Sequence, residues 1–514
     1  MGGGAQTVRE ASVAPGPSPG DAAARRAVLL IVAATLALRL PFAAGLGLGI
    51  DESYTTALSR EFHWGYFDHP PAVWWLAAAA ERLSGGEASL VVRLPFVLLF
   101  AATTWGMYRL TAFLFGARAG VWAVAALNVA PVLGVTSATW VLPDGPLDCA
   151  LVWATYALAR ALFGPRSSAS RWWLGAGILL GLAIDSKYTA FLVLAGAGVF
   201  LLATPGQRQW LARPQPYAGL LLAVLLLAPV LGWNAAHGWA SLAFQGGRAE
   251  GARWHPLAPL VTLGGEALFL LPWLWLLLAA EFVRGFTSRR ADPRRRLLVW
   301  LAAPVVVLFT VVGAWSSQRV LYHWAAPGYL LLMPLAGAWL AERNAAGARW
   351  PKRAAWTSAL FVWLLAGAAT SEMRLGWLAG LMGDDPRVLA AESQGVDWTS
   401  LKGELARRGL LERRDLFVAA TRYIDAGKID YALGGVLPVV CLGSDPRQYG
   451  LSHPLAAQAG KDGLILDARL APAAAAAAYG RDFDALETLP DIVVMRAGRP
   501  LIRLHAYIGR RLRR

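Results

Sequence analysis

The chain has 514 residues, of which 56% are apolar and only 16% are charged. Soluble globular proteins carry about 25% charged residues, so this composition argues against a soluble enzyme. The 48 Lys and Arg outnumber the 33 Asp and Glu and give a formal net charge of +15. These basic residues are scattered between long apolar runs, which argues against a nucleic-acid-binding protein. Two cysteines, Cys149 and Cys441, are too few for a disulfide framework or a Cys-rich metal site.

The apolar runs predict a polytopic membrane protein. Residues 1–26 are rich in Gly, Ala, Pro and Ser and predict a disordered tail. A helix needs about 20 apolar residues to cross the hydrocarbon core of a bilayer. On this basis we predict eleven spans, near residues 27–50, 90–115, 119–137, 143–163, 172–187, 189–204, 217–234, 260–283, 297–314, 324–341 and 354–371. The stretch 72–83 is too short to cross and predicts an interfacial helix.

The distribution of positive charge predicts the orientation. With the N-terminus in the cytoplasm, the inner loops hold 15 Lys and Arg and the outer loops hold six. This asymmetry follows the positive-inside rule. An odd number of spans then places residues 372–514 outside the cytoplasm.

The C-terminal segment 372–514 differs in character from the rest. Its apolar runs have the length of strands, at 416–420, 436–442, 463–466 and 491–495, and a helix-compatible segment lies between the first two. Residues 473–478 are all Ala and favour a further helix. We therefore predict a mainly α membrane bundle, residues 27–371, followed by a small extracytoplasmic α/β domain.

Acidic residues cluster in the predicted first outer loop, residues 51–89. Asp51 and Glu52 follow the first span directly. Ionisable groups at membrane depth usually line a substrate path, so Asp51 is a candidate general base facing a cavity. The alternative is that Asp51 only caps the helix that follows it.

Two further acidic residues precede helical segments in the outer loops. The segment from Tyr66 ends in Asp68-His69 before two prolines, which would hold Asp68 and His69 in one direction. Asp144 follows Pro143 at the start of the predicted fourth span. Alternatively, the Pro pair is a simple turn that stops a helix, and Asp144 is a cap.

Basic and aromatic residues in later outer loops are candidates for binding an anion. Lys187 lies between two adjacent apolar runs, where it either snorkels to the interface or binds a phosphate. Arg248, Arg319 and His323 could collect around an anionic group, whereas a structural account would pair each with a lipid phosphate. Tyr322 precedes His323 in a segment that also fits the interfacial aromatic belt.

These residues resemble, in this order, the GT-C glycosyltransferases that use polyprenyl-phosphate sugars. The most similar are bacterial members of glycosyltransferase family 39 related to protein mannosyltransferases and to the lipid A aminoarabinose transferase. The resemblance covers roughly residues 28–345, and its motifs are Asp51-Glu52, Tyr66 to Pro71, Pro143-Asp144, Lys187, Asn234 to Arg248 and Tyr322-His323-Trp324. The chain departs from the aminoarabinose transferases at Asp68-His69, where they carry an acid and a lysine.

The resemblance implies an inverting transfer of a monosaccharide from a polyprenyl-phosphate donor to an acceptor hydroxyl on the extracytoplasmic face. Asp51 and Asp144 are then the catalytic residues, with Asp51 as the main one and Asp144 in the same cavity. The implied substrate-binding residues are Glu52, Tyr66, Asp68, His69, Lys187, Arg248, Arg319, Tyr322 and His323. We expect His69, Lys187, Arg248, Arg319 and His323 to stabilise the charge of the leaving phosphate.

No obligatory cofactor is expected, although Asp144 and Asp68 either orient the acceptor or hold a divalent cation. The expected partners are the membrane, the lipid-linked donor and a lipid, glycan or protein acceptor, with no nucleic acid. The expected location is a bacterial inner membrane.

The alternative function is a transporter or flippase of a lipid-linked sugar or anionic solute. Transporters usually bind near the bilayer midplane and have internal repeats. Here the polar residues crowd the outer loops and no repeat is found.

Overall fold

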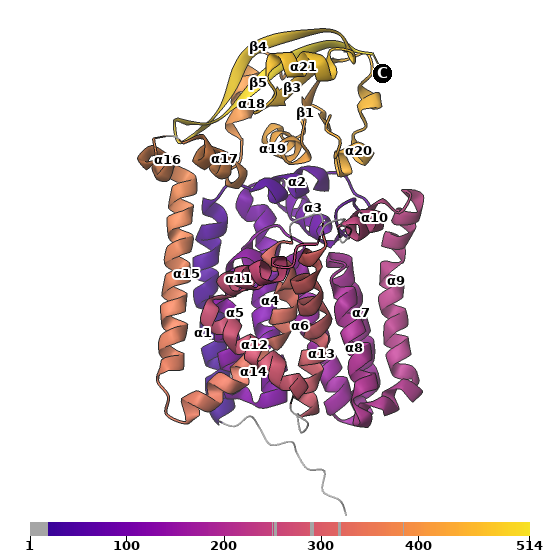
Figure 1. The fold of residues 1–514 in the computed structure, drawn as a ribbon, viewed down its shortest axis with the longest axis vertical. Coiled ribbons are helices and arrows are strands. Elements are labelled where there is room, and N and C mark those ends of the chain that lie inside the picture. Colours follow the sequence, from indigo (N-terminus) through magenta and orange to yellow (C-terminus); the bar gives the residue numbers. More distant parts are fainter. Residues whose placement is uncertain are drawn as a thin grey trace, which may run out of the picture.

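The computed structural model describes residues 19–248, 250, 254–287, 292–316, 320–383 and 385–513. A bundle of roughly parallel helices carries a small domain with a mixed sheet at one end (Figure 1). Short helices lie between the two parts. Arg319, one of the candidate site residues, and residues 1–18 of the predicted tail lie outside the described residues.

Each of the eleven apolar segments overlaps a helix in the bundle. The bundle contains α1 (Pro19–Gly45), α4 (Ser89–Phe115), α5 (Ala117–Val129), α6 (Asp144–Phe163), α7 (Ala169–Ser186), α8 (Ala190–Ala203), α9 (Pro214–Ala236), α11 (Ala258–Leu270), α12 (Pro272–Thr287), α13 (Pro293–Val311), α14 (Ala326–Ala345) and α15 (Trp350–Leu375). Among the described residues, six helices are long and apolar enough to cross a membrane, or up to eight if each of two bent pairs forms one span. The fold class is therefore confirmed, while the number eleven stays a prediction.

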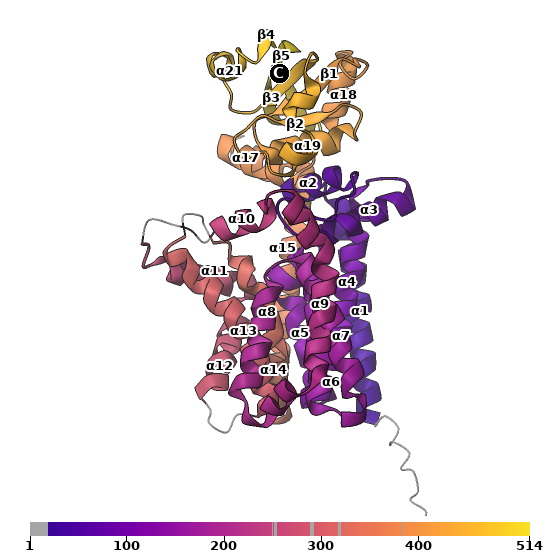
Figure 2. The same cartoon turned by 90° about the vertical axis from the view of Figure 1, so that its right-hand side faces the viewer.

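The predicted span at 260–283 is broken. α11 and α12 meet at an angle of 117° between Leu270 and Pro272. Proline cannot continue the helix ladder, because it lacks an N–H and clashes with the preceding turn. α11 consequently leaves the side of the bundle (Figure 2).

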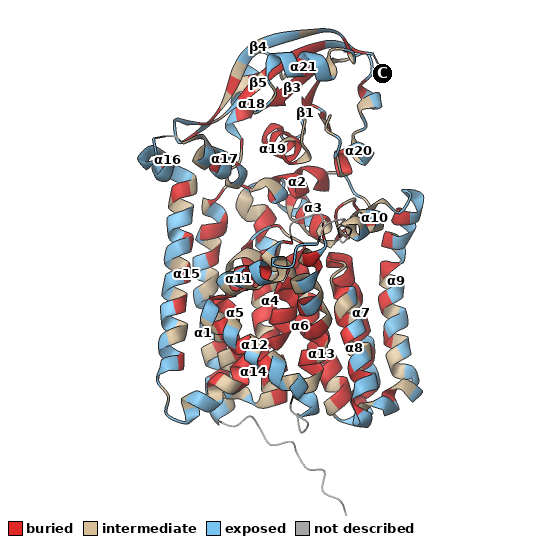
Figure 3. Ribbon diagram, viewed as in Figure 1, coloured by how far each residue is buried: buried red, intermediate tan, exposed pale blue. Residues whose placement is uncertain are grey.

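Burial in the bundle follows the pattern expected of a membrane protein. α4, α6 and α14 are buried at its centre, whereas the outermost helices α9 and α15 are largely exposed (Figure 3). The exposed side chains include Leu221 and Leu225 on α9, and Leu360 and Leu364 on α15. Apolar surface of this extent on a bundle is suited to lipid contact.

The first helix begins earlier than the composition predicted. α1 starts at Pro19, so residues 19–26 are helical and do not belong to a disordered tail. Proline is favoured in the first turn of a helix, and the acidic Asp21 interacts favourably with the helix dipole there. The Ala-rich segment that follows has high helix propensity.

Three short helices lie between the bundle and the sheet domain: α2 (Ile50–Ser59), α3 (Ala72–Ser84) and α10 (Ala240–Gly247). α3 confirms the helix expected at 72–83. A helix after Asp51 was considered only in the capping alternative, and α2 was not predicted from the apolar pattern, because its polar stretch of Asp51 to Thr56 shows no run of apolar residues. α2 is nevertheless almost completely buried, since the C-terminal domain covers it.

The C-terminal domain has the predicted α/β character. It contains α16 (Trp377–Leu381), α17 (Pro386–Gly395), α18 (Ser400–Arg407), β1 (Leu416–Ala420), α19 (Tyr423–Leu433), β2 (Val439–Cys441), α20 (Gln448–Ser452), β3 (Asp462–Asp467), α21 (Pro472–Tyr479), β4 (Phe483–Arg496) and β5 (Arg499–Leu512). The sheet order is β2-β1-β3-β5-β4. β1 pairs in parallel with β2 and β3, and β5 pairs antiparallel with β3 and β4.

β5 was not predicted from the sequence. Its arginines at 499, 503, 510 and 511 interrupt the apolar pattern. The strand forms through its hairpin with β4, whose two-residue turn Ala497-Gly498 has positive φ at both positions. Turns of this kind match the natural twist of paired strands.

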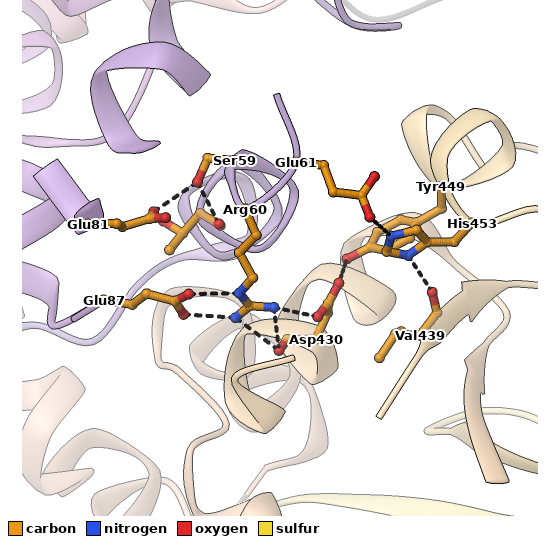
Figure 4. A network of polar contacts seen from close by, with 10 residues as sticks. Ser59, Arg60, Glu61, Glu81, Glu87, Asp430, Val439, Tyr449 and His453 are labelled. Atoms are coloured by element: carbon orange, nitrogen blue, oxygen red, sulfur yellow. Dashed lines mark hydrogen bonds and ion pairs between the residues drawn. The ribbon is translucent and has the colours of Figure 1, made fainter. Parts of the chain in front are cut away.

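The C-terminal domain is docked firmly on the first outer loop. α19 approaches α2 so closely that a Cβ atom on Gly427 would lie 2.8 Å from the Cα atom of Tyr54. Arg60 joins the two parts through ion pairs with Glu87, at 2.7 Å, and with Asp430, at 2.6 Å (Figure 4). One continuous apolar core includes residues of α2, α3, α19 and the sheet. The domain therefore forms part of the wall above the bundle.

Candidate active site

A cavity of about 1210 Å³ lies between the end of the bundle and the C-terminal domain. Its walls include α1, α2, the start of α6, the break between α7 and α8, α10 and α15, and from the C-terminal domain the end of α17, the start of α19 and the loop before α20. The Asp, Glu, His, Lys and Arg side chains of the lining are Asp51, Glu52, Asp68, His69, Arg93, Asp144, Lys187, Arg248, His323 and Arg447, and Gln245 adds a side-chain amide. The remaining walls are largely apolar. The cavity thus combines a charged region with a surface suited to a hydrocarbon chain.

Asp51 faces this cavity, so its side chain is open to the cavity space although it lies away from the outer surface of the protein. Among the described residues, no hydrogen bond or ion pair engages its carboxylate. Burial raises the pKa of Asp51, and the nearby charge of Asp68 raises this pKa further, whereas Arg447 opposes the shift. A carboxylate with a raised pKa and no partner is suited to accept a proton.

The capping alternative for Asp51 does not describe this structure. The residue before α2 is Gly49, and its N–H donates a hydrogen bond of 3.0 Å to Glu52, not to Asp51. Glu52 also accepts bonds from Arg93 Nε at 2.7 Å and from Arg93 Nη2 at 2.6 Å. The N–H of Val141 donates a further bond of 3.1 Å to Glu52. The oxygens of Glu52 are therefore engaged in holding the start of α2 against α4.

Asp68 connects the first outer loop to the C-terminal domain. It accepts hydrogen bonds from Tyr54 Oη and from Arg447 Nη1, each at 2.5 Å. Burial raises the pKa of Asp68, and the positive charge of Arg447 opposes that shift. The side-chain amide of Gln245 donates to the backbone carbonyl of Asp68. Asp68 is thus oriented from two sides.

His69 lines the cavity but does not supply the positive charge that we expected of it. Burial, together with the positive charges of Lys187 and Arg248, lowers the pKa of His69 to about 3. The imidazole is therefore neutral near pH 7, and it can donate a hydrogen bond but no charge. Its Nδ1 atom has no partner among the described residues.

Lys187 points into the cavity and binds Asp144. Its ammonium group lies 2.8 and 3.0 Å from the two carboxylate oxygens. The two residues are 8% and 6% exposed, so Lys187 does not snorkel to the surface. Asp144 opens α6, but its side chain accepts no capping hydrogen bond. The capping alternative for Asp144 therefore does not describe the structure either.

Arg248 is a second cation of the cavity. Its guanidinium lies 4.5 Å from the ring of Phe244 and 5.4 Å from that of Trp324. Burial lowers the pKa of Arg248, and the charge of Arg447 lowers it further. No described carboxylate forms an ion pair with Arg248. This guanidinium is therefore available to an anionic ligand.

Two of the candidate residues lie outside the cavity lining. Tyr66 is 1% exposed, stacks on Trp74 at 4.2 Å and donates a hydrogen bond to the Glu61 carbonyl. Tyr322 packs against α11, where a Cβ atom on Gly265 would lie 2.1 Å from its ring. By contrast, His323 lines the cavity near Asp144 and Lys187.

The sequence analysis missed several lining residues, most notably Arg447 and Tyr423 of the C-terminal domain. Arg447 follows β2, and Tyr423 follows β1. One signal was available, because ligands of open α/β sheets bind at the carboxyl ends of parallel strands. The sequence does not show, however, that this edge of the sheet faces the bundle.

A divalent metal ion in this cavity would need the same carboxylates as ligands. The described residues contain no group of three or more His, Cys, Asp and Glu side chains arranged to hold a metal ion. Asp144 and Asp68, the two candidate ligands, are paired with Lys187 and Arg447. A divalent cation would have to displace these positive groups.

The chain matches known glycosyltransferases in sequence. The sequence model of the family described as dolichyl-phosphate-mannose-protein mannosyltransferase matches residues 68–233. The lipid A galacturonosyltransferase RgtD of Rhizobium johnstonii is 26% identical over 275 residues, which are 51% of this chain and 54% of that protein. The match thus spans about half the length of that relative.

Solved structures extend the similarity to nearly the whole chain. ArnT from Cupriavidus metallidurans bound to undecaprenyl phosphate has a TM-score of 0.61 and 17% identity, with 93% of this chain and 97% of that chain covered. The chain has the GT-C glycosyltransferase fold. The apo state of the same ArnT has a TM-score of 0.59 and 18% identity, with 94% and 98% covered. The resemblance found in the sequence is confirmed for this GT-C fold, and the chain is a multi-pass membrane protein.

Proposed function

We propose that the protein is an inverting membrane glycosyltransferase. It transfers a monosaccharide from a polyprenyl-phosphate donor to a hydroxyl of a lipid, glycan or protein acceptor on the extracytoplasmic side of a bacterial inner membrane. The observation that carries this proposal is the contrast within one cavity between Asp51, which has no partner, and the ion-paired carboxylates of Glu52, Asp68 and Asp144. Of these four carboxylates, only Asp51 has no hydrogen-bond or ion-pair partner among the described residues, so it can accept a proton.

The proposed reaction is a single displacement. The acceptor oxygen attacks the anomeric carbon while its proton passes to Asp51. The bond between the anomeric carbon and the phosphate oxygen breaks, and polyprenyl phosphate leaves with the bonding electrons. Attack from the face opposite the phosphate inverts the anomeric configuration.

Cations of the cavity stabilise the leaving phosphate. Lys187 and Arg248 supply charge from two sides, and the neutral His69 supplies a hydrogen bond. Preorganised positive groups of this kind lower the energy of the charge that develops in the transition state. Arg319 and His323 stay candidates for the same role, Asp144 holds Lys187 in place, and Tyr66 and Tyr322 support the loops behind the site.

Two similarities support the choice of substrates. The ArnT structure of the same fold is bound to undecaprenyl phosphate. The relative RgtD is a lipid A galacturonosyltransferase. We therefore take a uronosyl polyprenyl phosphate as the first donor to test and lipid A as the first acceptor.

The position of the polar residues favours transfer over transport. They come mainly from α2, the loop before α3, the start of α6, the break between α7 and α8, and the C-terminal domain, and not from positions halfway along the helices. Transporters usually bind their substrate near the midplane.

The test is an assay of the purified protein with labelled polyprenyl-phosphate sugars and a panel of acceptors, with and without a chelator. We expect a new glycosidic bond of inverted configuration and no loss of activity on chelation. Movement of intact lipid-linked sugar across vesicles without bond formation would overturn the proposal.

A further inference from the structure

Arg447 reaches the cavity from the C-terminal domain, at the edge of the sheet where ligands of α/β domains bind. It lies beyond the carboxyl end of β2, and Tyr423 lies beyond the carboxyl end of the neighbouring β1. Both residues line the cavity. The carboxyl ends of parallel strands are the usual ligand-binding edge of such sheets. This edge of the domain therefore closes the cavity on the side opposite the bundle.

The backbone of Arg447 adopts a conformation that residues with a side chain rarely take. Its φ is 50° and its ψ is −132°. Such conformations persist only where the surroundings enforce them, and they are concentrated at functional sites. The guanidinium lies 4.0 Å from the ring of Tyr423 and 4.7 Å from that of Phe244. One aromatic ring from the C-terminal domain and one from α10 thus pack against the guanidinium of Arg447.

Part of the guanidinium of Arg447 is left without a partner. Nη1 donates to Asp68 at 2.5 Å, and Nε donates to Asp445 at 3.2 Å. Among the described residues, none accepts a hydrogen bond from Nη2. Arg447 lines the cavity, so this amino group can bind a ligand there.

The guanidinium of Arg248 also lies near the ring of Phe244. It lies 4.5 Å from Phe244 and forms no ion pair with a described carboxylate. Two like charges near one ring repel each other, and among the described residues Asp68 and Asp445 form ion pairs with Arg447 and not with Arg248. An anion bound between the two groups would relieve this repulsion. Guanidinium groups bind carboxylates and phosphates in a planar, bidentate manner.

We infer that Arg447 is a specificity-determining residue through which the C-terminal domain, together with Arg248, binds an anionic group of the donor. The inference rests on the proposed function. The anionic group is a carboxylate or phosphate type of oxyanion, and it has two sources: a carboxylate on the transferred sugar or the phosphate that links sugar and lipid.

The test compares Arg447→Gln and Arg447→Lys with the wild type and with Arg60→Gln. Arg60 is the matched control, because it also links the C-terminal domain to the first outer loop but does not line the cavity (Figure 4). For each protein, the dissociation constant of undecaprenyl phosphate is measured first. The kcat/KM is then measured with a uronosyl and with a neutral hexosyl undecaprenyl phosphate.

If Arg447 binds the sugar carboxylate, Arg447→Gln lowers kcat/KM for the uronosyl donor by about 10- to 100-fold. The hexosyl donor and the binding of undecaprenyl phosphate are then unaffected. If Arg447 binds the phosphate, binding of undecaprenyl phosphate weakens by a similar factor, and kcat/KM falls to the same extent with both donors. In either case we expect Arg447→Lys to restore only part of the loss, because it lacks the planar fork.

Arg447→Gln overturns the inference if its values for the lipid and for both donors equal those of Arg60→Gln, since Arg447 is then only a link between domains. This outcome differs from failure of the proposed function, in which the wild type itself binds no undecaprenyl phosphate and transfers no sugar.

Discussion

Lys187 donates hydrogen bonds to both carboxylate oxygens of Asp144, at 2.8 and 3.0 Å. The pair joins the break between α7 and α8 to the first turn of α6 and lies in the wall of the cavity. Its two members are 43 residues apart in the chain. The pair places a cation beside the proposed donor phosphate and fixes its position.

Replacing Lys187 with Ala should weaken the binding of undecaprenyl phosphate by about 2 to 3 kcal/mol, as expected for a hydrogen bond to a charged group. Lys187→Arg should be partly tolerated, because Arg keeps the charge but changes the geometry. Titration of purified protein measures both effects. Unchanged dissociation constants would show that Lys187 only orients Asp144.

A double variant separates binding from folding in that experiment. Lys187→Ala alone leaves the buried charge of Asp144 unpaired, which costs about 3 to 5 kcal/mol of stability. The variant Asp144→Asn/Lys187→Ala removes both charges, so its thermal stability should recover. Binding of undecaprenyl phosphate should nevertheless stay weak.

Asp51→Asn should lower kcat by about 10²- to 10⁴-fold, because it removes the proposed proton acceptor. Since no described residue bonds to Asp51, the thermal midpoint should stay near that of the wild type. Activity assays and thermal unfolding of the purified variant measure the two quantities. Retention of more than about a tenth of the activity would contradict the role of general base.

Glu52→Gln should lose stability but keep activity, which is the opposite of what we expect for Asp51→Asn. It leaves the buried guanidinium of Arg93 without a carboxylate, so we expect a loss of about 3 to 5 kcal/mol in stability. Any protein that stays folded should retain much of its kcat. A stable Glu52→Gln variant without activity would indicate instead that Glu52 takes part in the chemistry.

The dependence of kcat/KM on pH should report the environment of Asp51. Burial and the charge of Asp68 raise the pKa of Asp51, and a general base works only when ionised. Activity should therefore fall as the pH decreases through a value above that of an ordinary Asp. Asp68→Asn removes a negative neighbour and should move this acidic limb to lower pH. Arg447→Gln removes a positive neighbour and should move it to higher pH. If neither substitution shifts the acidic limb of the pH profile, that limb reports the ionisation of a group other than Asp51.

Reporter fusions test the predicted orientation. The first turn of α13, which contains Arg296, lies at the end of the bundle away from the C-terminal domain (Figure 2). A reporter after Arg296 should indicate the cytoplasm, and one after Arg513 should indicate the outside. Active alkaline phosphatase at Arg296, or inactive enzyme at Arg513, would contradict the orientation.

The sequence by itself determined the bundle and most of the C-terminal elements. Long apolar runs form helices whose backbone hydrogen bonds are satisfied within one segment, so each predicted span overlaps a helix without knowledge of its neighbours, although the span at 260–283 is broken into α11 and α12. The short strands β1, β2 and β3 were likewise visible as apolar runs. Among the elements that the apolar pattern did not reveal, α2 and β5 carry polar or basic residues and owe their stability to contacts with distant parts of the chain.

The tertiary structure alone decided which charges meet. Several candidate residues line the cavity as the sequence predicted, but their partners are distant: Asp68 and Arg447 are 379 residues apart. The composition of the outer loops does not reveal that Glu52 is neutralised by Arg93 while Asp51 is left free, because adjacent residues on a helix point in different directions. Ionisation and catalytic roles depend on burial and on the nearest charge in space. Both are properties of the folded chain.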